Sequence, residues 1–150
     1  LLEAAVQLAA VISEQPTALE QAAANYGRYV GTAFQLVDDL LDYTADVDTM
    51  GKEPGDDLSE GKPTLPLLYA MWHGTLEESA LIRHAIEHGG ERDKLDQVLA
   101  IMQRTGALEY TKQKAIEQSE KAIAELAPLP DSDYKKALIA LARISVERVA

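Results

Sequence analysis

The chain has 150 residues, 47% hydrophobic and 26% charged, which is typical of a globular domain and argues against disorder over its whole length. Its 14 basic and 25 acidic residues give a net charge of −11, which disfavours a nucleic-acid partner and an anionic membrane surface. The absence of cysteine excludes disulfides, thiolate metal sites and thiol catalysis, and no apolar run is long enough for a transmembrane helix. We expect a cytoplasmic protein.

Apolar residues recur at helical spacing along almost the whole chain. The first helix is expected from Leu1 to about Ser13, and Pro16 separates it from a long second helix over about 18–46. Charged residues with Pro and Gly then predict an extended polar loop over 46–62.

Further helices are expected after this loop. One begins near Thr64, and the next begins at Thr75, where Glu78 has the capping-box spacing, and ends at Gly89. Three more are expected over about 92–104, 106–127 and 133–149. No strand pattern and no dividing linker is visible, so we predict an all-α helical bundle in which residues 1–150 form part of one domain. Because Leu1 reads as helix interior with no capping residue before it, we expect the chain to be cut from a longer protein.

The second helix carries a stripe of polar side chains. At about 100° per residue, Gln35, Asp38, Asp39 and Asp42 fall within one arc of about 100°. The opposite face is apolar and includes Phe34. Carboxylates four residues apart repel each other on a helix, and Asp is a poor helix former. Two explanations remain open: a solvated acidic face, or a bound divalent cation, for which oxygen ligands alone suit Mg²⁺.

Two Gly-Lys pairs occur in the polar segment that follows the stripe. They place Lys52 and Lys62 in a Gly-containing stretch, and lysine binds phosphate as a compact point charge. Beside an acidic metal site, two such lysines indicate a polyphosphate ligand. A plain surface loop is the alternative for this segment taken alone.

Together, the stripe and the loop resemble the trans-type prenyl diphosphate synthases, the polyprenyl synthetase family. The stripe matches their second aspartate-rich motif, DDxxD, as Asp38-Asp39-Leu40-Leu41-Asp42, with Phe34-Gln35 before it. The segment from Gly51-Lys52 to Gly61-Lys62-Pro63-Thr64-Leu65-Pro66-Leu67 matches the motif that follows in the family. The form of this segment is most similar to long-chain bacterial members, which make precursors of quinone side chains. The resemblance implies an isoprenoid-synthase fold, present here as an incomplete C-terminal portion.

The resemblance implies a magnesium site. Family members use three Mg²⁺ ions to hold an allylic diphosphate. By resemblance, Asp38 is the main ligand from the second motif, and Asp39 and Asp42 complete the acidic cluster. The first aspartate-rich motif of the family is missing from this chain and is expected upstream of Leu1.

The resemblance also implies the reaction and its groups. Lys52 and Lys62 match basic residues near the allylic diphosphate, and Gln35 matches a side chain near the reacting carbon. The implied prenyltransferase reaction ionises the allylic diphosphate, which isopentenyl diphosphate then attacks, and a proton is lost. Metal ions and lysines stabilise the departing diphosphate in the transition state.

The implied partners are the two diphosphates, the missing N-terminal half and a second copy of the chain, as a homodimer or other self-association. We expect the 150-residue chain alone to be inactive, because it carries one wall of the active site. Two alternatives stay open: a non-catalytic subunit of the same fold that assembles with an active synthase, and a related terpene synthase.

Overall fold

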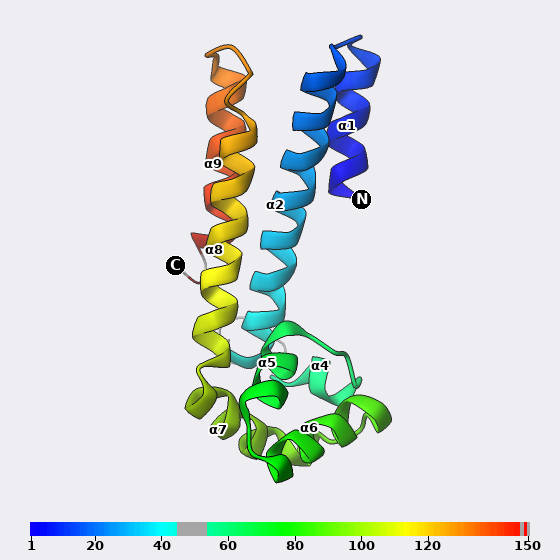
Figure 1. Ribbon diagram of the computed structural model, residues 1–150, viewed down its shortest axis with the longest axis vertical. Coiled ribbons are helices and arrows are strands. Elements are labelled where there is room, and N and C mark those ends of the chain that lie inside the picture. The colour runs from blue at the N-terminus through cyan, green and yellow to red at the C-terminus, as the bar shows by residue number, and fades with distance from the viewer. Residues whose placement is uncertain (45–53, 148, 150) are drawn as a thin grey trace. The chain divides into compact units, whose positions relative to one another are not determined.

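The computed structural model describes residues 1–44, 54–147 and 149, which are helical throughout apart from turns and short connections (Figure 1). Among these residues no strand occurs, so the predicted all-α class is confirmed. No helix in the described part of the chain combines the length and apolar character needed to cross a membrane. The chain divides into two compact units, one formed by Leu1–Val37 with Gln113–Ala150 and the other by Asp38–Lys112.

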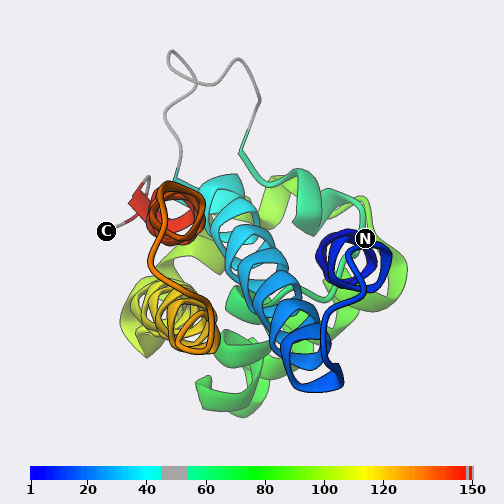
Figure 2. The ribbon, with the colours of Figure 1, turned by 90° about the horizontal axis from the view of Figure 1, so that it is seen from above.

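Long helices build the first unit. They are α1 (Leu2–Ile12), most of α2 (Thr17–Thr44), most of α8 (Ala107–Glu125) and α9 (Asp133–Glu147). Within this unit α1, α8 and α9 lie around α2 (Figure 2). Its buried cluster joins α2 to α8 and α9 through Tyr26, Val30, Ala122, Leu126 and Ala142. The Tyr26 hydroxyl also donates a hydrogen bond of 2.8 Å to the Leu138 carbonyl, so α2 and α9 are held by a polar contact as well as by packing.

Glycine lets α1 approach α2 closely. A Cβ atom at Gly27 would lie 2.6 Å from the Leu2 carbonyl oxygen, and one at Gly31 would lie 3.3 Å from the Leu2 side chain. The two glycines, four residues apart on α2, therefore allow the close contact between these helices. Most of the apolar face of α2 is buried, but Phe34, which belongs to that face, is 50% exposed.

Short helices build the second unit. They are α4 (Asp56–Ser59), α5 (Leu65–His73), α6 (Leu76–His88), the 3₁₀ turn η1 (Arg92–Lys94) and α7 (Leu95–Thr105). Their core contains Leu58, Leu67, Ile82, Val98 and Met102, each of which is fully buried.

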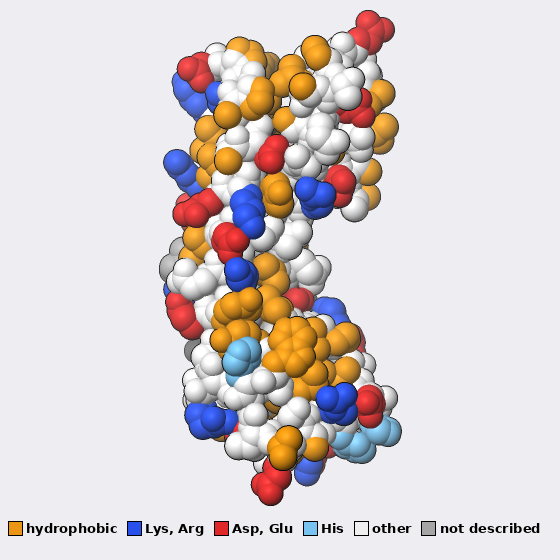
Figure 3. Space-filling model, in the orientation of Figure 1, with side chains coloured by type: hydrophobic (Ala, Val, Ile, Leu, Met, Phe, Trp, Pro, Cys, Tyr) orange, Lys and Arg blue, Asp and Glu red, His pale blue; other side chains and the backbone are white. Residues whose placement is uncertain are grey.

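The helix caps follow the sequence. The Thr75 hydroxyl accepts the Glu78 N–H, and the Glu78 carboxylate accepts the Thr75 N–H at 2.7 Å, so the predicted capping box at the start of α6 is confirmed. The Ser132 hydroxyl accepts the Lys135 N–H at 3.1 Å and caps α9. On the face shown in Figure 3, acidic and basic side chains are interspersed in both units.

One prediction about the fold is wrong. The sequence predicts an extended polar loop over 46–62. Residues 46–53 lie outside the described residues, but residues 56–59 form α4 and bury Leu58 completely. The helix forms because Gly55, at a φ of 86°, turns the chain and because a carboxylate from α2 receives a backbone N–H of α4. The expectation that residues 1–150 belong to one domain stays a prediction.

Candidate active site

The three motif aspartates of α2 have different surroundings. Asp38 is exposed, Asp39 is 7% exposed, and Asp42 is half-buried. A uniformly solvated acidic face would leave all three in water. Asp39 does not fit that alternative, because its carboxylate has been removed from most of its solvent contact.

Asp42 is tied to the start of α4. Its carboxylate Oδ2 accepts the Asp57 backbone N–H at 3.0 Å, and its backbone carbonyl accepts the Gly55 N–H at 3.0 Å. Burial raises the pKa of the Asp42 carboxyl, the Asp57 N–H lowers it, and the nearby carboxylates of Asp57 and Asp56 raise it. Asp42 thus supplies the N-terminal cap that α4 does not obtain from its own Gly55.

Lys62 follows α4 in the chain and contacts two acidic side chains. Its ammonium Nζ donates to Asp57 Oδ1 at 2.8 Å and lies 3.7 Å from Asp39 Oδ1. The hydrogen bond to Asp57 raises the pKa of Lys62 and keeps it a cation, against the opposing effect of burial. The Lys62 side chain is still 43% exposed, so its ammonium remains accessible to a ligand.

A Schellman turn fixes the spacing between Asp57 and Lys62. The Lys62 N–H donates to the Asp57 carbonyl at 2.9 Å, and the Gly61 N–H donates to the Leu58 carbonyl at 3.1 Å. Gly61 has a φ of +67°, and a Cβ atom there would lie 2.7 Å from the Ile86 carbonyl oxygen. In the sequence Asp-Leu-x-x-Gly-Lys, the glycine is therefore required by the backbone of the turn, whereas the Asp and the Lys supply the charged groups.

The donor set suits a hard cation that is shared with a ligand. In the described ranges, no three carboxylate or imidazole groups gather in a way that could hold a metal ion, so the aspartates of α2 do not form a complete site by themselves. Mg²⁺ commonly takes only one or two carboxylates and completes its shell with phosphate oxygens and water. The exposed carboxylate of Asp38 fits that pattern, whereas the carboxylate of Asp42 already accepts a backbone hydrogen bond from α4. The assignment of Asp38, Asp39 and Asp42 to a metal stays a prediction.

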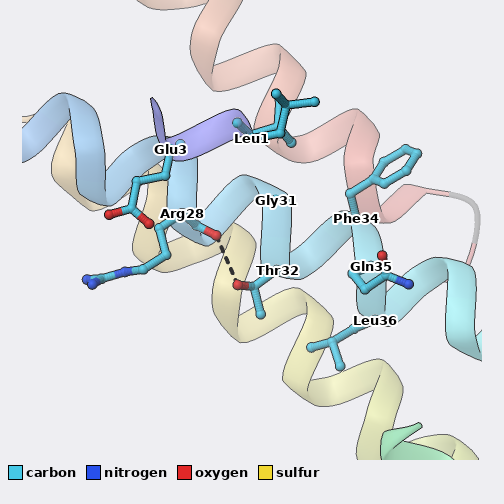
Figure 4. Close-up of a pocket in the computed structure, with 10 residues that line it drawn as sticks. Leu1, Glu3, Arg28, Gly31, Thr32, Phe34, Gln35 and Leu36 are labelled. Atoms are coloured by element: carbon cyan, nitrogen blue, oxygen red, sulfur yellow. Dashed lines mark hydrogen bonds between the residues drawn. The ribbon is translucent and has the colours of Figure 1, made fainter. Parts of the chain in front are cut away.

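Gln35 and Lys52 are the other two predicted site residues. Gln35 belongs to the first unit, where it lines a groove of about 510 Å³ between the start of α1 and the middle of α2, together with Phe34 and Leu36 (Figure 4). Lys52 lies outside the described residues. The roles of Gln35 and Lys52 therefore stay predictions.

Asp57 is not among the site residues that the sequence predicts. It is 8% exposed and contacts Lys62, although it looks in the sequence like one more charge of a polar loop. Tyr43 and Thr64 are also buried, and burial raises the pKa of Tyr43. In the sequence, the contact between Asp57 and Lys62 is indicated by the spacing of Asp57 from the Gly61-Lys62 pair.

The chain is similar to known proteins in both sequence and fold. Residues 1–102 match the family model described as Polyprenyl synthetase. Over 99% of its length the chain is 54% identical to octaprenyl diphosphate synthase from Haemophilus influenzae and 53% identical to that of Escherichia coli, of which it covers 45% and 46%. The chain thus spans less than half the length of these relatives.

Solved structures give the same result for the fold. A decaprenyl diphosphate synthase from Rhodobacter capsulatus matches 99% of this chain and 45% of its own, with a TM-score of 0.87 and 37% identity. A polyprenyl synthase from Caulobacter crescentus, complexed with calcium and isoprenyl diphosphate, matches 99% of this chain and 46% of its own, with a TM-score of 0.86 and 37% identity. The chain belongs to the polyprenyl synthetase family.

Proposed function

We propose that this chain is the C-terminal part of a single prenyl synthase domain in a long-chain, octaprenyl-like diphosphate synthase. The complete enzyme condenses isopentenyl diphosphate with an allylic diphosphate and makes precursors of quinone side chains. The observation that carries this proposal is the 54% identity to an octaprenyl diphosphate synthase over 99% of the chain. A cytoplasmic location and self-association, as a homodimer, belong to the same proposal.

The ligand of the second unit is proposed to be the allylic diphosphate. An ammonium has three N–H donors, and Asp57 takes one of those on Lys62, which leaves donors for phosphate oxygens. Lys62 is already held in place, so little of its side-chain freedom is lost on binding. Lys52 is proposed to bind the same diphosphate.

The cofactor is proposed to be Mg²⁺, with Asp38 as the main ligand and Asp39 and Asp42 adding negative charge around it. When bound, Mg²⁺ stabilises the negative charge that develops on the departing diphosphate. The calcium and isoprenyl diphosphate in the Caulobacter relative support a divalent cation together with a diphosphate. Gln35 is proposed to stabilise the developing allylic cation with its amide oxygen.

The chain alone is proposed to be inactive. Condensation requires two diphosphates to be positioned in one water-excluded pocket, and positioning supplies roughly 7–11 kcal/mol of such a barrier. A chain that covers 45% of its relative lacks much of the corresponding protein.

An activity assay tests the proposal. The complete enzyme is incubated with Mg²⁺, isopentenyl diphosphate and a farnesyl-type primer, and the products are separated by length. We expect long-chain products from the complete enzyme, none after chelation of the metal, and none from the 150-residue chain. A complete enzyme without condensation activity would overturn the proposal, and clear turnover by the chain alone would overturn the claim of inactivity.

A further inference from the structure

Two buried carboxylates surround the Lys62 ammonium unequally. Asp57 Oδ1 lies at 2.8 Å, within hydrogen-bond distance, whereas Asp39 Oδ1 lies at 3.7 Å and acts through charge alone. Asp57 is 8% exposed, so the atoms packed around its side chain restrict its movement. Lys62 is therefore held at one point, by Asp57.

The backbone also joins these two residues. The Schellman turn bonds the Lys62 N–H to the Asp57 carbonyl at 2.9 Å, so the residues are joined through main chain and side chain. The Asp57 N–H is in turn bound by Asp42 at 3.0 Å. A continuous set of hydrogen bonds thus runs from α2 through the first turn of α4 to the ammonium.

We infer that Asp57 is a positioning residue of the condensation reaction, which holds the Lys62 ammonium in the orientation that binds the allylic diphosphate. This inference rests on the proposed function. Asp57 itself does not contact the substrate, because its carboxylate is buried and its negative charge would repel a diphosphate. Its effect on the reaction passes through Lys62 alone.

The test compares variants of the complete enzyme. Asp57→Ala removes the contact, and Asp57→Asn keeps an oxygen that accepts from Lys62 but removes the charge. Because a hydrogen bond to a charged group is lost, Asp57→Ala is expected to raise the KM for the allylic diphosphate about tenfold, and Asp57→Asn is expected to raise it less. The KM for isopentenyl diphosphate should not change.

Asp56→Asn is the matched control. It removes the same charge from the neighbouring residue of α4, whose carboxylate pairs with Arg92 and not with Lys62. We expect its kinetic constants to remain close to those of the unmodified enzyme. A loss of folded enzyme would lower kcat without changing one KM selectively, so equal effects on both substrates, or a fall in kcat alone, would overturn the inference.

A double-mutant cycle tests whether the effect passes through Lys62. In a Lys62→Ala background, Asp57→Ala should change the KM for the allylic diphosphate less than about twofold, because the residue it positions is already absent. Additive effects of the two substitutions would mean that Asp57 acts by another route, and would overturn the inference.

Amine labelling tests the anchoring without measuring activity. Only the unprotonated amine reacts with acetic anhydride, so loss of Asp57 should speed acetylation of Lys62 several-fold, as measured by mass spectrometry. Lys121, which is similarly exposed and paired with Glu117 at 2.7 Å, serves as the internal reference. An unchanged rate at Lys62 would overturn the anchoring whatever the activity, whereas faster labelling in an enzyme without condensation activity would overturn the proposed function and leave the contact intact.

Discussion

The Asp42 carboxylate receives the backbone N–H of Asp57 at 3.0 Å, across fifteen positions of sequence. This bond places the start of α4 against the last turns of α2. The third aspartate of the DDxxD motif therefore has a structural use that its position in a metal-binding motif does not reveal. Because Asp42 caps a helix, its effect on the stability of the protein can be measured separately from its effect on the reaction.

Replacement of Asp42 should distinguish capping from charge. Asp42→Ala should lower the free energy of unfolding by about 1 kcal/mol, as loss of a helix cap usually does. Asp42→Asn keeps an acceptor oxygen and removes a partly buried charge, so it should cost less. Urea unfolding followed by circular dichroism measures both. Equal losses in the two variants would contradict the capping role.

The turn at Gly61 should tolerate no side chain. Gly61→Ala should cost about 2–4 kcal/mol, because it combines a left-handed backbone with a Cβ that would lie 2.7 Å from the Ile86 carbonyl oxygen. Gly90→Ala is the matched control, with a φ of +76° and no atom within 4 Å of the added Cβ, and should cost only about 1–2 kcal/mol. Denaturant unfolding should rank the two variants in this order, and the reverse order would disprove the clash.

The contact between α1 and α2 offers a similar pair in the first unit. Gly27→Ala places a Cβ 2.6 Å from the Leu2 carbonyl oxygen and should destabilise the protein by about 1–3 kcal/mol. Gly31→Ala meets a flexible Leu2 side chain at 3.3 Å, and the better helix propensity of Ala, about 1 kcal/mol, should offset that contact. Thermal unfolding should therefore show a lower Tm for Gly27→Ala than for Gly31→Ala. Similar Tm values would mean that α1 moves away easily.

The stability that the capping box at the start of α6 contributes should depend on pH. The Thr75 N–H, and then Arg104, lower the pKa of Glu78 from its ordinary 4.5, so the ionised carboxylate stabilises the folded state. That contribution is complete above pH 4.5 and is lost as the pH falls from there through the lower pKa of the folded protein. Glu78→Gln should thus be less stable than the unmodified chain at pH 7, and the difference should shrink toward acid. Urea unfolding at several pH values measures the difference, and a difference that stays constant toward acid would contradict the role of the Glu78 carboxylate.

Local patterns predicted most of the helices. The apolar spacing, the Thr75 capping box and the proline and glycine breaks each act within a few residues, so they can be read without knowledge of tertiary contacts. Helix α4 could not be predicted in this way. Its cap comes from Asp42, and Leu58 is buried by residues distant in sequence, so a short polar segment became a packed helix.

The candidate site was predictable to a similar extent. The motif identified Asp38 and Lys62 as candidates, but spacing on a helix did not reveal that Asp38, Asp39 and Asp42 differ in exposure, because exposure depends on neighbouring elements. The contact between Asp57 and Lys62 depends on a turn with positive φ at Gly61, which becomes visible only when the backbone is known.

Asp38 should separate function from stability. Its side chain is exposed, so Asp38→Ala should change the free energy of unfolding by no more than about 0.5 kcal/mol and leave the helical circular dichroism unchanged. In the complete enzyme the same substitution removes the proposed main metal ligand. It should lower turnover at saturating Mg²⁺ by at least the roughly 10–100-fold that loss of a group behind a metal ligand causes. Asp96→Ala, which removes another exposed helical carboxylate of the second unit, is the control and should retain full turnover. If Asp38→Ala keeps turnover within about threefold of the unmodified enzyme, the metal assignment is wrong.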